Sequence, residues 1–89
     1  MMKKRSFVFF HDPSHGWLRV SFGDLVAVGM KINGISKFSY QKNFHIYLEE
    51  DCDVPYFISK WEKKFGIIKI FHQYSKNDST IRQYERIHP

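Results

Sequence analysis

The chain has 89 residues with a net charge of +5, 43% of them hydrophobic and 18% aromatic, which allows one small domain over residues 1–89. No apolar run approaches the ~20 residues of a transmembrane helix, and the apolar stretch after the basic start is too short for a secretory signal, so we expect no membrane partner. The single cysteine, Cys52, excludes an internal disulfide and predicts a reducing, cytoplasmic location.

The first predicted element is a β-hairpin. Residues 7–11 are rich in β-forming side chains, and residues 12–16 contain the Pro and Gly of a turn. Residues 17–22 then alternate, which places Leu18, Val20 and Phe22 on one face and Trp17 and Arg19 on the other. The hairpin therefore has one apolar face for a core and one aromatic and basic face.

A short helix and a second hairpin follow along the chain. Ser21 and Asp24 resemble a capping box and predict a helix of about two turns over residues 23–29, ending at Gly29. Residues 38–40 and 44–48 are predicted to be paired strands, with residues 41–43 between them.

The main helix is predicted over residues 54–65. Pro55 fits only in the first turn, which favours Asp53 over Asp51 as the N-cap, and Gly66 ends the helix. Five apolar side chains recur at helical spacing and give the helix a core-facing side: Val54, Phe57, Ile58, Trp61 and Phe65.

Residues 67–74 form the most apolar predicted strand, and we expect it at the centre of the sheet. Residues 75–79 are a predicted loop, and residues 80–86 a terminal edge strand. The order of elements predicts an α+β domain, a mostly antiparallel sheet of about 4–6 strands with both helices on one face. The other face would carry some combination of Trp17, Arg19, His45, Tyr47, His72 and Tyr74.

Four carboxylates lie at the junction between the second predicted hairpin and the main helix: Glu49, Glu50, Asp51 and Asp53. Carboxylates near a helix N-terminus are stabilised by the helix dipole and by unpaired backbone N–H groups. One or two carboxylates satisfy that role, so contact with a basic partner and metal or acid–base chemistry stay open for the others. We favour capping and solvation.

Two kinds of reactive chemistry are open to the sequence. A nucleophilic Cys52 would need a positive environment, which its acidic neighbours oppose. No phosphate-binding loop or hydrolase motif is present, so we expect a protein that is not an enzyme and needs no cofactor. A metal site would need closely grouped nitrogen, sulfur and oxygen ligands, and the candidates for it are His11, His15, Cys52 and Asp53.

The C-terminal segment carries alternating basic and aromatic residues. If it is extended, Arg82, Tyr84 and Arg86 share one face, and with Trp17 and Arg19 nearby that face could stack bases and bind phosphates. The alternative is an edge strand that charge protects from aggregation, and we favour this alternative.

Residues 11–18, 38–40, 47–53 and 81–85 resemble a family of small proteins found in phage, plasmid and bacterial genomes. The family patterns are close to H-D-P-G-H-G-W-L, S-Y-S-Y, Y-L-E-E-D-C-D and I-R-x-Y-E. The resemblance covers most of the chain and departs from the pattern at Ser14, where the family has Gly. It implies an origin in a mobile element and does not indicate an activity.

We expect a non-catalytic binding protein of phage origin that docks on a host macromolecule, in the first place a protein, and modulates or inhibits it. Large aromatic and arginine side chains dominate interface energies, and acidic residues steer association. The predicted binding residues are Trp17, Arg19, Tyr47, Glu49, Glu50, Asp51, Asp53, Arg82 and Tyr84. One alternative is a nucleic-acid or nucleotide binder that uses the aromatic and basic face. A second alternative is a metal-dependent hydrolase that uses His11, His15, Asp51 and Asp53.

Overall fold

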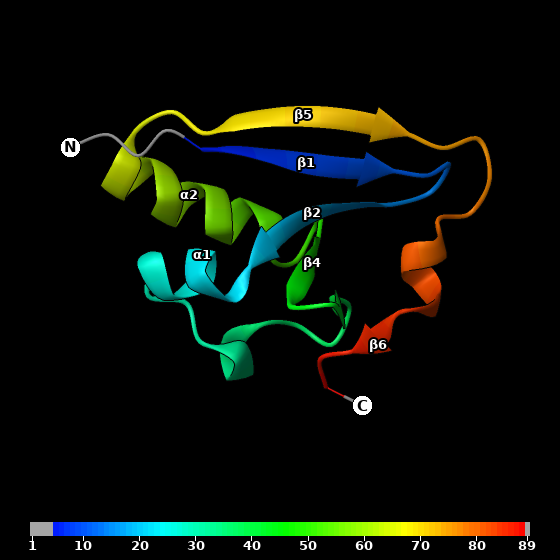
Figure 1. Ribbon diagram of the computed structural model, residues 1–89, viewed down its shortest axis with the longest axis horizontal. Helices are drawn as coiled ribbons and strands as arrows, with labels where there is room; N and C mark the ends of the chain where they lie inside the picture. The colour runs from blue at the N-terminus through cyan, green and yellow to red at the C-terminus, as the bar shows by residue number, and fades with distance from the viewer. Residues whose placement is uncertain (1–4, 89) are drawn as a thin grey trace.

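The computed structural model describes residues 5–88 and confirms an α+β domain built on a mostly antiparallel sheet (Figure 1). Within these residues the sheet has six strands in the order β5-β1-β2-β4-β3-β6, and only the β1–β5 pair is parallel. The strands are β1 (Ser6–His11), β2 (Gly16–Ser21), β3 (Tyr40–Lys42), β4 (His45–Glu49), β5 (Lys69–Tyr74) and β6 (Glu85–Arg86). The helices are α1 (Phe22–Ala27) and α2 (Val54–Phe65), with short 3₁₀ helices η1 (Ile32–Gly34) and η2 (Thr80–Gln83).

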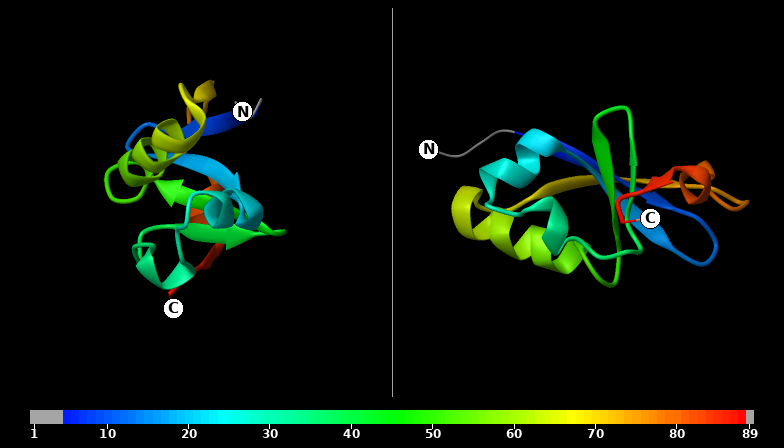
Figure 2. Two further views of the ribbon diagram at one scale, coloured as in Figure 1. Left: turned by 90° about the vertical axis from the view of Figure 1, so that its left-hand side faces the viewer. Right: turned by 90° about the horizontal axis from the view of Figure 1, so that it is seen from below.

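The core lies between α2 and one face of the sheet. The register pairs Phe9 with Leu18 and Leu18 with Leu48, so these side chains share that face. The ring of Phe7 meets Phe57 and Trp61 of α2 edge-on, at centroid distances of 5.6 and 4.9 Å. Figure 2 shows α2 lying along the sheet on this side. The apolar stripe predicted for residues 54–65 is therefore confirmed as the core-facing side of α2.

The capping box predicted at the start of α1 is confirmed. The side chain of Ser21 accepts a hydrogen bond from the backbone of Asp24, and the Asp24 carboxylate accepts one from the backbone of Ser21. Arg5 forms an ion pair with the same carboxylate at 2.6 Å. The helix begins and ends earlier than predicted, and Gly29 follows it with a positive φ of 74°.

The prediction that residues 67–74 form the central strand is wrong, because β5 is an edge strand. β4 and β5 both run parallel to β1, so α2 makes a crossover connection between two strands of the same direction. This crossover passes over β1 and β2 and brings the chain out at the far edge of the sheet. An apolar run identifies a strand, but it does not say which neighbours the strand has.

Two further boundaries differ from the prediction. The second hairpin is shifted along the chain and closes through Asn43 and Phe44, which both have positive φ, as a tight two-residue hairpin turn requires. The prediction of a terminal strand over residues 80–86 is wrong for Thr80–Gln83, which form η2. Within this segment only Glu85 and Arg86 form a strand, and they pair with β3 at the edge.

Replacing Gly16 with Ala is expected to lower the free energy of unfolding by about 1–3 kcal/mol, the usual cost of overpacking a core. A Cβ at Gly16 would lie 2.2 and 2.7 Å from two ring atoms of Phe9, and Phe9 is buried. Chemical denaturation measures the effect. Gly34→Ala is the matched control, because a Cβ at Gly34 meets nothing within 4 Å. Equal stability of the two variants would contradict the prediction.

Candidate binding site

The face of the sheet opposite α2 is partly covered by a segment that we call the strap, residues 75–84. The strap leaves β5 at one edge of the sheet and leads through η2 to β6 at the other edge (Figure 1). Ile81 of η2 is buried against a second cluster of rings that comprises Trp17, Tyr40 and Tyr47. The strap therefore closes a second small core on this face.

This arrangement corrects the prediction that Trp17 and Tyr47 are exposed binding residues. Trp17 is 2% exposed and Tyr47 is 8% exposed. The register does place them, with Arg19, on the face opposite Leu18, as predicted. The prediction failed because it treated residues 80–86 as a strand beside the sheet, whereas η2 lies on the sheet and covers the rings.

The position of two β5 residues also differs from the expectation. His72 and Tyr74 pair in parallel with Phe9 and His11, so they lie on the side of the core rather than on the second face. His11 donates or accepts a hydrogen bond with His72 at 2.8 Å, and its ring stacks on Tyr74 at 4.4 Å. Burial, followed by the nearby His72, lowers the pKa of His11.

Arg82, a predicted binding residue, ties the strap to the β1–β2 turn instead. Its guanidinium donates to both carboxylate oxygens of Asp12, at 2.7 and 3.0 Å, and to the hydroxyl of Ser14 at 2.7 Å. It also lies 5.3 Å from the centroid of Trp17. The same carboxylate accepts backbone N–H groups of Ser14, His15 and Ser79. The hydrogen bond from Arg82 is the main cause that holds the pKa of Asp12 well below its ordinary value.

The acidic junction at residues 49–53 divides into buried and exposed carboxylates. Glu49 is 7% exposed, and it accepts the backbone N–H groups of Asp51 and Cys52, both at 2.9 Å. Asp53 is 4% exposed, whereas Asp51 is exposed and Glu50 half-buried. Asp53 occupies the N-cap position of α2, as predicted. Its side chain, however, makes no capping hydrogen bond.

Asp53 instead anchors the chain before β3. Its carboxylate accepts the backbone N–H of Ser36 at 3.0 Å, the hydroxyl of Ser36 at 2.7 Å and the hydroxyl of Ser39. Ser39 is fully buried, and its oxygen also accepts the backbone N–H of Glu49 at 2.9 Å. Asp53 is therefore a structural residue rather than a surface ligand.

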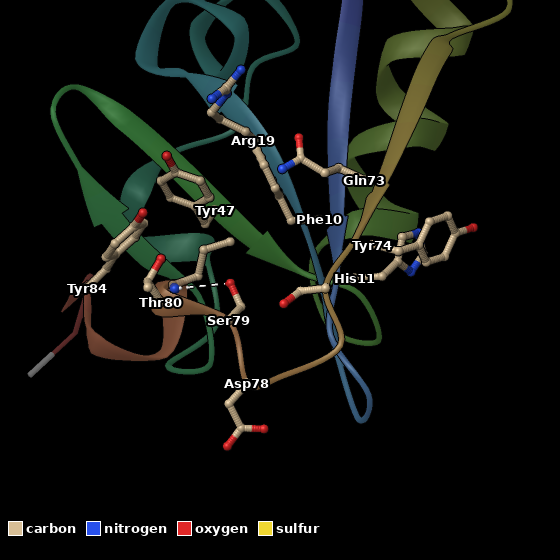
Figure 3. Close-up of a pocket in the computed structure, with 12 residues that line it drawn as sticks. Phe10, His11, Arg19, Tyr47, Gln73, Tyr74, Asp78, Ser79, Thr80 and Tyr84 are labelled. Carbon is tan, nitrogen blue, oxygen red and sulfur yellow. Dashed lines mark hydrogen bonds between the residues drawn. The ribbon is translucent and has the colours of Figure 1, made fainter.

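A cavity of about 350 Å³, which we call cavity A, lies between the strap and the sheet beside β5 (Figure 3). Its walls include Phe10, Arg19, Tyr47, Gln73 and Tyr84. The Arg19 guanidinium lies 5.3 Å from the Phe10 ring centroid, and the Tyr84 ring meets the Tyr47 ring at 5.0 Å. Burial is the main cause that raises the pKa of Tyr47, against an opposing hydrogen bond from Arg19.

A second cavity of about 360 Å³, cavity B, has Arg82 in its lining. Its lining includes His15, Phe38, Glu49, Asp51 and Cys52. Desolvation, followed by the hydrogen bond to Glu49, raises the pKa of the exposed Cys52 thiol, which opposes a role as nucleophile. Seven of the nine predicted binding residues line these cavities, with Arg19, Tyr47 and Tyr84 at cavity A and Trp17, Glu49, Asp51 and Arg82 at cavity B, whereas Glu50 and Asp53 line neither of them.

The predicted metal ligands are not brought together as one group. His11 pairs with His72 and Asp53 is held by Ser36 and Ser39, while His15 lies next to Glu50. The sequence reasoning missed Asp12 as the centre of an ion-pair network. The turn composition of residues 12–16 could have indicated that Asp12 accepts its own turn N–H groups. Nothing local indicated its partner Arg82.

Comparison of the chain with protein-family models, with curated proteins and with solved structures found no match. Among residues 5–88 no helix has the length and apolar character needed to cross a membrane. The function is therefore inferred from the geometry of the surface itself.

Proposed function

We propose that this chain is a non-catalytic protein-binding module that docks its partner by strand addition along the free edge of β5. In strand addition, an extended segment of the partner forms main-chain hydrogen bonds to an exposed sheet edge, and pockets for alternate side chains supply specificity. The resemblance to phage and plasmid proteins suggests a host protein as the partner. Docking would modulate or inhibit that protein.

The observation that carries this proposal is the unprotected state of β5. Within residues 5–88 no strand lies on its outer side, and Phe71 and Tyr74 are 54% and 75% exposed. Proteins normally protect a long edge strand with lysines, proline, a bulge or a covering segment. β5 has six residues, no proline and a single charged residue, Lys69 at its start.

The opposite edge of the same sheet provides an internal comparison. β6 has only two residues, and both of them, Glu85 and Arg86, are charged and exposed. Arg86 also donates a hydrogen bond to the carbonyl of Lys37 at 2.7 Å. One edge of the sheet thus carries the usual protection against pairing, and the other edge lacks it.

The surroundings of β5 indicate the chemistry of the partner segment. Ile67 just before the strand is 91% exposed, so the edge is apolar as well as unpaired. Lys69 and Lys76 are cations at its two ends, and the chain as a whole carries +5. We infer an extended partner segment that alternates apolar residues with acidic ones. Cavity A, which Gln73 helps to line, is available to a side chain of that segment.

The test is affinity capture from host cells, with and without nuclease, using the wild-type chain and two variants. Phe71→Lys places a charge in the middle of the free edge and is expected to weaken partner binding by about tenfold or more, as loss of an aromatic anchor does. Phe44→Lys is the matched control, because Phe44 is 86% exposed at the turn between β3 and β4. We expect the wild-type chain to capture one protein whether or not nuclease is present. Phe71→Lys should fail to capture this protein, and Phe44→Lys should capture it like the wild type.

Backbone hydrogen exchange of the complex separates strand addition from side-chain docking. Amides of β5 are expected to exchange more slowly when the partner is bound, because an added strand forms hydrogen bonds to the edge. A partner retained by Phe71→Lys would contradict the proposal. Release of all captured material by nuclease would instead support nucleic-acid binding at Arg19 and Tyr84 of cavity A. Self-association of the pure chain that Phe71→Lys abolishes would identify a second copy as the occupant.

A further inference from the structure

Three side chains of the types that bind metals meet at the end of the β2–β4 pair, beside cavity B. His15 belongs to the turn between β1 and β2, Glu49 is the last residue of β4, and Glu50 follows it. The backbone N–H of Glu50 donates to the carbonyl of Gly16 at 3.0 Å, which continues the pairing of these strands. One ligand atom from each of the three side chains lies within 4.8 Å of the other two.

Hydrogen bonds to the backbone position two of these three residues, Glu49 and His15. Glu49 is 7% exposed, and one of its carboxylate oxygens accepts the N–H groups of Asp51 and Cys52. Such hydrogen bonds orient a carboxylate in the way that outer-shell partners orient metal ligands. The N–H of His15 donates to Asp12 at 2.9 Å, which fixes the turn that carries the imidazole. His15 and Glu50 lie next to each other, with Nδ1 and Oε1 3.9 Å apart.

We propose that His15, Glu49 and Glu50 bind one divalent transition-metal ion. An imidazole with two carboxylates suits the borderline cation Zn²⁺, and also Mn²⁺, which takes carboxylate ligands, better than Mg²⁺ or Ca²⁺, which prefer oxygen ligands alone. Two converging carboxylates repel each other, and a divalent cation compensates both charges. Three protein ligands leave coordination positions for water or for a group from cavity B, where Asp51 and Cys52 also lie.

The two arginines that line this cavity are engaged with other groups. The Arg82 guanidinium lines cavity B, but it forms a two-contact ion pair with Asp12. Arg86 also lines the cavity and donates to the Lys37 carbonyl. The site is separate from the proposed docking edge, since β1 and β2 lie between β4 and β5. Failure of either proposal therefore leaves the other standing.

The test titrates the full chain, free of added tags, with Zn²⁺ and with Mn²⁺ and follows binding by calorimetry and by the shift in melting temperature. We expect one ion per chain, with a rise in melting temperature because only the folded chain holds the ligands together. Glu50→Gln and His15→Asn are each expected to weaken binding by about 100-fold or more, since loss of an outer-shell partner alone costs 10–100-fold.

Two control variants make the assignment specific. His72→Asn removes one member of the His11–His72 pair, where two imidazoles meet away from the proposed site, and Glu85→Gln removes an exposed carboxylate on β6. Both are expected to bind metal like the wild type. Binding lost with His72→Asn, binding unchanged in Glu50→Gln and His15→Asn, or no binding by the wild type would each overturn the proposal. Circular dichroism of every variant confirms that it is folded.

Discussion

Replacing Asp12 with Ala is expected to lower the free energy of unfolding by about 3–5 kcal/mol, the cost of breaking a buried ion pair by removing one partner. The Asp12 side chain is fully buried and joins three parts of the chain: its own turn, Ser79 and the guanidinium of Arg82. Without the carboxylate, the strap loses its main attachment and Arg82 loses its counter-charge. Urea denaturation followed by tryptophan fluorescence measures the loss, because Trp17 lies directly under Arg82.

The pH dependence of stability tests the same contact independently. The pKa of Asp12 is held well below its ordinary value of 3.8, so the carboxylate stabilises the folded state above that pH. As the pH falls below about 3.8, the unfolded chain binds the proton first and this contribution is lost progressively. The difference in stability between the wild type and Asp12→Asn should therefore be largest above pH 5 or so and should shrink in acid.

A second acid-sensitive range and one control complete this experiment. The pKa of His11 is lowered from 6.5, so the unfolded state binds a proton more readily and stability falls as the pH drops below 6.5. That loss is common to the wild type and Asp12→Asn and cancels in their difference.

Asp78→Ala is the control for Asp12→Ala. It removes an exposed carboxylate from the strap and is expected to change stability by no more than about 0.5 kcal/mol. A stability loss for Asp78→Ala equal to that for Asp12→Ala would contradict the prediction.

The features that sequence predicted well are those decided by neighbours along the chain. Val54, Phe57 and Trp61 recur at helical spacing, and Ser21 and Asp24 lie three residues apart in a capping box, so local chemistry alone determined both helices. The alternation of residues 17–22 likewise assigned Leu18 and Trp17 to opposite faces. In each case the deciding contact is no more than a few residues away.

The features that sequence could not predict depend on contacts across the whole chain. Arg82 and Asp12 are 70 positions apart, and no pattern around either residue indicates the other. Their ion pair holds the strap against the β1–β2 turn, and the strap decides whether Trp17 and Tyr47 are exposed. The alternation correctly placed both rings on the second face, but it could not show that Ile81 would cover them. For this reason the rings of the predicted binding face form a second small core.

The acidic junction falls between these two cases. Capping and solvation, the favoured interpretation of residues 49–53, does not describe Glu49 and Asp53, because both are buried and heavily hydrogen-bonded. The capping explanation was wrong for Asp53, because its partners are Ser36 and Ser39 rather than the first turn of α2. A carboxylate next to a helix start satisfies the capping pattern in sequence whether or not its side chain turns towards the helix.

Replacing Asp53 with Ala is therefore expected to lower the free energy of unfolding by about 2–4 kcal/mol, because it leaves several buried or half-buried donors without an acceptor. Asp51→Ala, at an exposed neighbouring carboxylate, is the control and should cost no more than about 0.5 kcal/mol.

Asp53→Ser distinguishes a capping role from a role in the serine network, since serine is a good N-cap but is too short to reach both Ser36 and Ser39. Equilibrium denaturation should show Asp53→Ser to be nearly as damaging as Asp53→Ala, and a serine variant as stable as the wild type would return Asp53 to the role of a helix cap. A double-mutant cycle with Ser39→Ala should give a coupling energy of about 0.5–3 kcal/mol, as expected for two residues in one buried network.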